Sequence, residues 1–490
     1  MIRFIKTSLL ALAASGTLLL GCRFGDVNVN PNAPTDAPMN VLLPAAQANL
    51  SYGINGDIAQ FNSIFLQQIG GVENIYLSVG QYDLNGNLAA RVWDGNLYPG
   101  SMNDFSIIIR KATEQNAPHY RGVARVMMAN ALGQAVDLWN NVPYSEAFRG
   151  NAANNRVVQP RYDSGQALYD TVQTLLSQAI VDLQATTSTA SPGRDDLVYG
   201  GNRARWVLAA RALKARYFNH LSKVAPEQSA QRALEQIQAG TFASNADDAR
   251  IVFGNTVDAA GPWFRFLVGS FGNGVRAGEF FVNLLQQRND PRLPFYVRAN
   301  TTGTPFVGTP AGVSRPQASQ LGGYINRPEA PANFITFVET EFIEAEANLR
   351  LGRRAEAAAA FNAAVAASIN KVTAPIPAFG LTTSTTANQA YIRQYGSETA
   401  ETITLDKIFT EKYIGLYLEP EAWTDWRRSS TADRPNGVPS LTLAASSQQF
   451  TSGRFPRRWP YPLSEVQQNR ANVDAQGATT TITDRVFWDR

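Results

Sequence analysis

The side chains that most often carry catalysis or hold metal ions are scarce in this chain of 490 residues. It has one cysteine, Cys22, and two histidines, His119 and His220. Zinc sites combine several cysteine and histidine ligands at short spacing, and neither histidine has a partner at such a spacing. A serine triad would need one of the histidines, yet neither lies beside a nucleophile motif. We therefore expect both histidines to be ordinary surface or capping residues.

Cys22 ends a stretch that has the features of an export signal. Two basic residues precede an apolar run that finishes Leu19-Leu20-Gly21-Cys22. The run is too short for a stable membrane span, and Leu-x-Gly-Cys resembles the bacterial lipobox, in which the cysteine is lipidated and becomes the new N-terminus. We predict a signal peptide at 1–21 and lipidation of Cys22, because two or three acyl chains bind a membrane tightly. The alternative is an ordinary signal peptide with a cysteine near its end; in either case disulfides and thiol catalysis are excluded.

The segment 73–98 interleaves rings with polar side chains in a pattern suited to a sugar. A sugar ring offers an apolar face and a rim of hydroxyls, so its site needs an exposed aromatic platform with polar groups around it. The candidate ligand residues here are Tyr76, Tyr82, Asn87, Trp93 and Tyr98. The alternative is that Trp93 and Tyr98 are core residues that clamp the helix expected from residue 103.

A second candidate is the glycine-rich segment 261–276. Its candidate ligand residues are Trp263, Arg265, Phe271 and Arg276. An arginine could bind a carboxylate or a uronic acid through two parallel hydrogen bonds. The alternative is that the rings of this segment only seat the loop on neighbouring helices.

A partial calcium-loop spacing occurs at Asp83, Asn85, Asn87 and Asp94, which fall at positions one, three, five and twelve. The motif requires glycine at position six and a bidentate glutamate at twelve. Here glycine stands at position four and aspartate at twelve. We therefore predict no metal and no other cofactor; calcium at this loop is the alternative.

The elements that must position these residues are mostly helices. Apolar residues recur at helical spacing over 39–51, 57–69, 103–115, 119–138, 164–185, 203–223, 227–239, 336–351, 354–370, 387–395 and 401–418. An Asn/Pro-rich arm at 22–38 precedes them, and a Gly/Pro-rich region at about 240–335 predicts loops and short elements. We expect one domain over 39–490, interrupted by that region.

Composition limits the partners. Charged residues make up 17% of the chain, the formal net charge is +3, and basic residues do not cluster, which argues against a nucleic-acid partner. No apolar run after residue 22 is long enough to span a membrane.

The helices at 336–351 and 354–370 resemble a tetratricopeptide repeat, in which small residues let two helices approach and a phenylalanine packs between them. The residues with this spacing are Gly352, Ala357, Phe361 and Ala364. The acids Glu339 to Glu346 fall outside the apolar stripe, and we expect them on a solvated face.

Six stretches, in order along the chain, resemble the SusD/RagB family of outer-membrane nutrient-binding lipoproteins. They are residues 28–35 (NVNPNAPT), 142–147 (VPYSEA), 289–294 (NDPRLP), 339–352 (ETEFIEAEANLRLG), 411–428 (EKYIGLYLEPEAWTDWRR) and 455–472, which opens FPRR. A small departure is the ending Phe487-Trp488-Asp489, where the family often has two tryptophans. Because ligands differ across the family, we interpret Trp423, Trp426, Arg427 and Arg428 as structural.

The resemblance implies a mostly α fold with about four repeat-type helix pairs, a large loop-rich ligand-binding face and few short strands. It implies a lipid-anchored outer-membrane protein, facing the cell exterior, that passes a nutrient to a SusC-like TonB-dependent transporter. Family members commonly bind oligosaccharides, some bind peptides, and none is expected to be an enzyme. A peptide ligand, and a helical glycoside hydrolase with a pair of carboxylates, remain the alternatives.

Overall fold

Helices make up most of the computed structural model, which describes residues 37–150, 155–431, 434, 436–477 and 481–490. The predicted signal peptide, Cys22 and nearly all of the arm lie outside the described residues. None of the helices in the described ranges combines the length and apolar character that crossing a bilayer requires.

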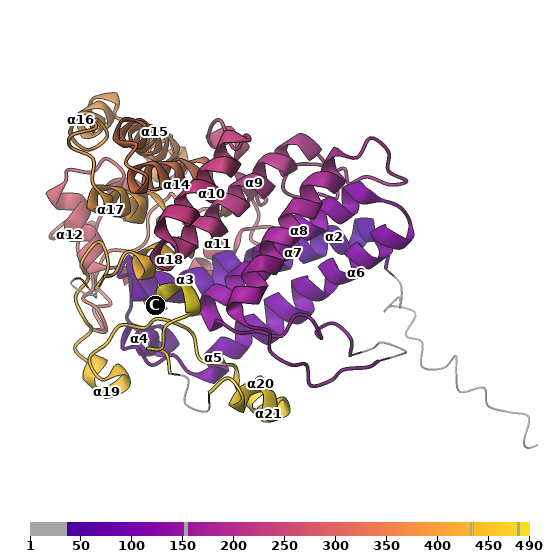
Figure 1. The fold of residues 1–490 in the computed structure, drawn as a ribbon. Helices are drawn as coiled ribbons and strands as arrows, with labels where there is room; N and C mark the ends of the chain where they lie inside the picture. The colour runs from indigo at the N-terminus through magenta and orange to yellow at the C-terminus, as the bar shows by residue number, and fades with distance from the viewer. Residues whose placement is uncertain (1–36, 151–154, 432–433, 435, 478–480) are drawn as a thin grey trace, which may run out of the picture.

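The long helices lie close to their predicted positions. They are α2 (Met39–Tyr52), α6 (Asn103–Glu114), α7 (Pro118–Trp139), α8 (Gly165–Gln184), α9 (Arg203–Asn219), α10 (Pro226–Gln238), α14 (Phe337–Arg350), α15 (Arg354–Val372), α16 (Thr385–Tyr395) and α17 (Leu405–Gly415). Figure 1 shows α6, α7 and α8 at one side, α9 and α10 in the middle, and α14 to α17 at the other. Successive pairs α7/α8, α9/α10 and α14/α15 pack together, and α16 and α17 both contact α15. The predicted helix-pair scaffold is confirmed.

Local sequence signals set where these helices begin and how closely they approach. The Ser164 side chain accepts from the amide of Ala167 at the start of α8, and Thr336 caps α14 in the same way. Pro118 and Pro226 open α7 and α10. A Cβ atom at Gly133 would lie 2.2 Å from the Tyr217 ring, so only glycine lets α7 come this close to α9.

The pair α14/α15 has the predicted repeat packing. Gly352, at φ +74°, makes the turn between the two helices. Phe342 and Phe361 meet between them with ring centroids 6.1 Å apart, and Ala357 and Ala364 are buried beside them.

The segment predicted as a single helix over 57–69 is divided. A π-helical segment, η2 (Gly53–Ile58), precedes α3 (Ala59–Phe65), and the chain then enters a strand. Gly56 breaks the helical geometry, with φ −100° and ψ −114°. Several helices had no strong periodic signal because they are short or irregular: α4 (Asn74–Gly80), α5 (Gly86–Ala90), the π-helical η3 (Arg91–Met102), α18 (Glu421–Arg428), α19 (Ser447–Thr451), α20 (Leu463–Gln468) and α21 (Arg470–Asp474).

Two small antiparallel sheets organise the 240–335 region: one joins it to the segment after α3, and the other joins its two ends. Strand β1 (Ile69–Gly71) pairs with β3 (Val275–Ala277), and β2 (Ala249–Ile251) pairs with β4 (Ala332–Ile335). The region also holds α11 (Pro262–Val268), α12 (Glu279–Gln287) and α13 (Leu293–Tyr296), in agreement with the expected loops and short elements.

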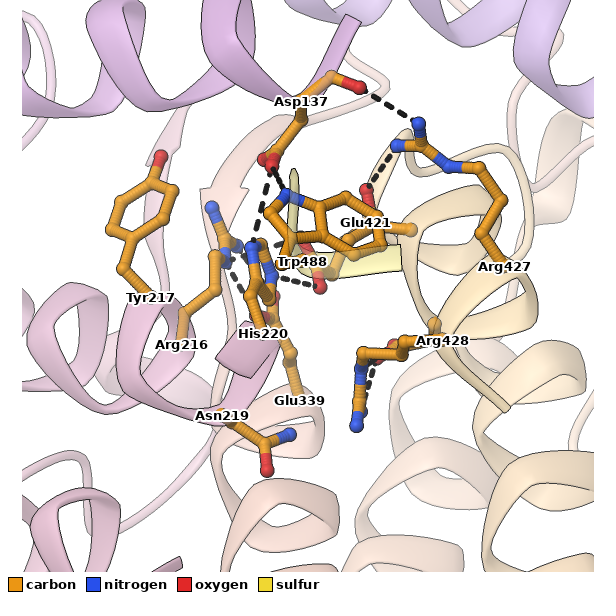
Figure 2. A network of polar contacts seen from close by, with 12 residues as sticks. Asp137, Arg216, Tyr217, Asn219, His220, Glu339, Glu421, Arg427, Arg428 and Trp488 are labelled. Atoms are coloured by element: carbon orange, nitrogen blue, oxygen red, sulfur yellow. Dashed lines mark hydrogen bonds and ion pairs between the residues drawn. The ribbon is translucent and has the colours of Figure 1, made fainter. Parts of the chain in front are cut away.

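The prediction that both histidines are surface or capping residues is wrong. His220 is fully buried, and its ring contacts the Glu421 carboxylate at 2.7 Å (Figure 2). The ring also contacts the Tyr169 hydroxyl at 2.8 Å. His119 is also buried, against the Ser191 hydroxyl and the carbonyl of Ala185. Polar partners from distant parts of the chain satisfy both rings, a pairing that no local pattern reveals.

The expectation of a solvated acidic face on α14 is also wrong for two of its residues. Glu339 and Glu346 are fully buried, because arginines on other helices reach them. Arg216 of α9 binds both oxygens of Glu339 (Figure 2). Arg428 of α18 binds both oxygens of Glu346. Trp423, Trp426, Arg427 and Arg428 are all buried, which confirms their interpretation as structural residues.

Candidate ligand-binding site

A hollow with aromatic walls opens where η3, the loop after α7 and the C-terminal helix α20 meet. We call it the aromatic hollow; its volume is about 370 Å³. Its lining residues are Trp93, Asp94, Tyr98, Pro99, Asn103, Pro143, Glu146, Ala147, Phe148, Val157, Pro160 and Glu465. Two residues predicted to contact ligand, Trp93 and Tyr98, therefore share one wall.

Stacked rings form this wall. The centroids of Trp93 and Tyr98 are 4.4 Å apart, and Tyr98 stacks on Phe148 at 6.1 Å. Trp93 also stacks on Tyr162 at 6.4 Å. Trp93 is only 3% exposed and backs the wall, whereas Tyr98 and Phe148 are half-buried and face the space. Half-exposed rings of this kind can contact an apolar ligand face.

Hydrogen bonds to backbone carbonyls hold the wall in place. The Tyr98 hydroxyl donates to the carbonyl of Pro143 at 2.8 Å, which fixes the loop after α7. Trp139, at the end of α7, packs edge-on to Trp93 at 5.0 Å and donates to the carbonyl of Pro460 at 2.8 Å. The rings therefore rest on the long helix α7 and on the C-terminal loop together, which makes the hollow largely preformed.

Three carboxylates line the hollow, and its described lining residues include no Lys, Arg or His. Arg161 forms an ion pair with Glu146 at 2.6 Å. Glu465 accepts from the Tyr162 hydroxyl at 2.8 Å and from the Asn469 amide at 3.1 Å, both at Oε2. Asp94 accepts from the Ser464 hydroxyl at 3.0 Å. Asp94 and Glu465 are thus oriented and keep acceptor positions for ligand hydroxyls.

Phe148 occupies a strained position between two hollows. Its φ of +62° is rare for a bulky residue and is typical of functional loops. It also lines a neighbouring hollow of about 920 Å³, which contains Ile107, Arg110, Tyr144 and Arg149 among its walls. A ligand longer than one sugar ring could extend from one hollow into the other across this ring.

Tyr76 and Tyr82 do not form the exposed platform that the sequence predicted. Both are almost fully buried. The ring centroids of Tyr76 and Phe61 are 6.1 Å apart, and those of Tyr82 and Phe65 are 6.3 Å apart. These rings meet because α4 lies against α3. Burial raises the pKa of Tyr82 to about 12, in keeping with a core position. Asn87 is exposed on α5 and does not line the aromatic hollow.

The candidate residues of the 261–276 segment are likewise either buried or exposed away from the aromatic hollow. Trp263 is buried, and Phe266 of α11 packs against Tyr76 at 5.1 Å. The Arg276 guanidinium donates to backbone carbonyls of its own region, including that of Pro316 at 2.7 Å. Arg265 and Phe271 are exposed, Phe271 by 50%, but neither lines the aromatic hollow. The structure therefore does not bring the two predicted segments into one site.

The residues with calcium-loop spacing include the N-cap of a helix instead. The Asn85 side chain accepts from the amides of Asn87 and Leu88 and so caps α5. In the described ranges, no three His, Cys, Asp or Glu side chains gather in a way that could hold a metal ion.

Sequence reasoning missed Phe148, which lines the hollow, and Tyr162, which supports it from behind through Trp93 and Glu465. Both lie in a loop region with no periodic pattern, and they come together only because α7 and α20 bring distant segments into contact. The one available signal was the stretch 142–147, which ends one residue before Phe148.

A family model and solved structures both resemble this chain. The model of a SusD-like family, described as starch-binding and associating with the outer membrane, matches residues 31–462. No protein of curated function matches the sequence.

Several solved structures have a similar fold. A SusD/RagB family protein from Bacteroides thetaiotaomicron has a TM-score of 0.78 at 21% identity, covering 93% of this chain and 99% of its own. A chitin-binding protein has a TM-score of 0.77 at 22% identity, covering 92% and 100%. A chitin-binding SusD homolog from Flavobacterium johnsoniae has a TM-score of 0.71 at 19% identity, covering 92% and 97%. At these identities the similarity establishes the fold.

Proposed function

Since the chain belongs to the SusD-like family, whose description is starch-binding and outer-membrane association, we propose that it is a cell-surface lipoprotein that binds an oligosaccharide and delivers it to a SusC-like TonB-dependent transporter. Lipidation of Cys22 would anchor it to the outer membrane, facing the cell exterior. It acts as a binding protein and not as an enzyme, and it needs no cofactor.

The aromatic hollow carries this proposal. Tyr98 and Phe148 offer ring faces for the apolar side of a sugar, and the carboxylates of Asp94 and Glu465 accept from its hydroxyl groups. Hydrogen bonds between neutral hydroxyls and carboxylates add orientation without requiring a charged ligand. Because the described lining supplies acids and no basic side chain, the hollow favours neutral over acidic sugars.

The names of similar proteins indicate where to search for the ligand. Two of them are described as chitin-binding, and the family as starch-binding. Both polymers are chains of largely uncharged sugar rings, which suits the aromatic wall. We therefore place chito- and malto-oligosaccharides first among the ligands to be tested.

Isothermal titration tests the proposal with the purified mature protein in detergent. The ligands are neutral chito-oligosaccharides, malto-oligosaccharides, an acidic oligogalacturonate and a set of oligopeptides. We expect binding of a neutral oligosaccharide, with each sample unchanged in sugar composition after overnight incubation. Binding of peptides alone would favour the peptide alternative. Release of sugar that disappears in Glu465→Gln would instead identify a hydrolase.

A further inference from the structure

A second hollow, which we call the arginine hollow, lies in the C-terminal region and carries the opposite charge. Its volume is about 330 Å³. Its lining residues are Asn436, Leu443, Gly453, Arg454, Phe455, Arg457, Thr483 and Arg485. It shares no lining residue with the aromatic hollow, so it is a separate site.

Arg457 is the fixed part of this hollow. It is only 5% exposed, and its Nε and Nη2 atoms donate to the two oxygens of Asp489 at 2.8 and 2.7 Å. Nη2 also donates to the Ser430 hydroxyl at 2.8 Å. A guanidinium held by this many contacts cannot turn away, so its positive charge stays beside the hollow.

Positive charge exceeds negative charge around this residue. Asp489 is fully buried, and it is the shared carboxylate partner of Arg457, Lys223 at 2.9 Å and Arg485 at 3.2 Å. In the described part of the chain, the guanidinium of Arg454 makes no ion pair or hydrogen bond. One carboxylate therefore serves three cations, and a fourth lies in the wall of the hollow.

Arg427 adds to the excess of positive charge beside Arg457. Its Nη1 atom donates to the backbone carbonyl of Asp137 at 2.8 Å (Figure 2). The same atom donates to the carbonyl of Arg457 at 2.8 Å, and to no carboxylate. Burial lowers the pKa of Arg427 to about 10, and Arg457 adds to this shift against the opposing effect of Asp137 and Asp489. Burial also lowers the pKa of Lys223, and the nearby Arg485 and Arg457 lower it further.

Two other acids of this region, Asp484 and Asp406, lie outside the walls of the hollow. The Asp484 carboxylate accepts from the amide of Thr481 at 2.6 Å, and Asp406 pairs with Arg434 at 2.6 Å.

We propose that the arginine hollow binds one oxyanion group, a carboxylate or sulfate, of a small molecule or of a sugar residue. The guanidinium groups of Arg454 and Arg485 hold the anion, and the Thr483 hydroxyl and Asn436 amide are within the same wall to donate to it. Phe455 and Leu443 supply an apolar side suited to a ring that carries the acid. The site is independent of the neutral-sugar function proposed for the aromatic hollow.

Thermal unfolding and titration test this proposal with the mature protein, Arg454→Gln and Arg470→Gln. Arg454 is exposed and outside the buried ion pairs, so its replacement should leave the fold intact. Arg470 is an exposed arginine on α21 that pairs with Asp474 and serves as the matched control. Sulfate, galacturonate and galactose are compared at constant ionic strength, because sulfate also stabilises proteins by exclusion from their surface.

We expect a saturable rise in the unfolding temperature of the mature protein and of Arg470→Gln with sulfate or galacturonate. Affinity should fall about tenfold or more in Arg454→Gln, and galactose should have no effect. A response to galacturonate would identify a sugar acid as the source of the anion, and a response to sulfate alone would identify a sulfate group. Equal, unsaturated responses of all three proteins to every anion would overturn the proposal.

Discussion

At the scale of single residues, ring faces that remain exposed decide where a sugar can bind. Phe148 is the sharpest probe, because it lines both neighbouring hollows and stacks on Tyr98. We predict that Phe148→Ala weakens oligosaccharide binding by roughly tenfold or more, because burying a phenylalanine ring contributes about 1.5–3 kcal/mol. Isothermal titration measures the change.

Phe271→Ala is the matched control for this substitution. Phe271 is a more exposed phenylalanine in the other segment that the sequence nominated, and it lies outside the aromatic hollow. Its removal should leave affinity within about twofold of the unmodified protein. A large loss of affinity in Phe271→Ala, with no loss in Phe148→Ala, would show that the ligand binds at the 261–276 segment instead.

His220 gives stability a defined pH dependence. Burial by itself lowers the pKa of this ring, but the carboxylates of Glu421 and Asp137 raise it to about 9 from 6.5. The charged ring therefore stabilises the fold fully below pH 6.5, and this contribution is lost as pH rises through 9. Glu421 behaves oppositely. Burial raises its pKa, but His220 and Arg216 lower it to about 2, so its contribution is lost in acid.

We predict that raising the pH from about 6 to about 10 lowers the free energy of unfolding by roughly 3 kcal/mol through His220. Urea unfolding measures this loss, and His220→Asn should remove most of it. If His220→Asn loses as much unfolding free energy between pH 6 and pH 10 as the unmodified protein, the ring is neutral in the folded protein.

Sequence reasoning at this scale identified Trp93 and Tyr98 as candidate site residues but misplaced Tyr76 and Tyr82. All four belong to one segment that mixes rings with polar residues, and local spacing does not show which rings α3 covers. Burial is a property of tertiary contacts, and so is the pairing of Glu339 with Arg216. This explains why two acids predicted to be solvated are fully buried.

At the scale of elements, charged side chains join helices that lie far apart in the sequence. Glu346 of α14 binds Arg428 of α18 and Arg350 of its own helix. Burial raises the pKa of Glu346, but Arg428 and Arg350 lower it well below its usual range. We predict that Glu346→Gln lowers the free energy of unfolding by about 3–5 kcal/mol, because the buried Arg428 loses one of its two carboxylate partners and Asp425, which remains, is already shared with Lys412.

Glu344 on the same helix provides the control. It is half-buried and takes part in no ion pair among the described residues. Urea unfolding of Glu344→Gln should give a change within about 0.5 kcal/mol. If the two substitutions cost the same, the pair between α14 and α18 does not hold the scaffold together.

The long helices were predictable because their apolar period continues over three turns or more. Within η2 and η3 that period is interrupted by Gly56 and by Pro99, and the short α18, α20 and α21 are too brief to show one. The residues of the site fall mainly on these irregular elements. The scaffold was therefore predicted well and the site only in part.

At the scale of the whole molecule, the scaffold and the C-terminal loops form the site jointly. The long helix α7 supports one wall, and α20, which is distant in sequence, supplies Glu465 to the other. In the proposed function, a lipid at Cys22 would hold this preformed site above the membrane, where a transporter could receive the ligand.

Hydrogen–deuterium exchange, measured with and without the oligosaccharide of highest affinity, tests the central claim most directly. Amides gain protection where a ligand orders or covers the backbone. We predict new protection in peptides covering η3, residues 143–149 and α20, with no change across 261–276. Protection confined to 261–276, or no protection anywhere at saturating ligand, would contradict the assignment of oligosaccharide binding to the aromatic hollow.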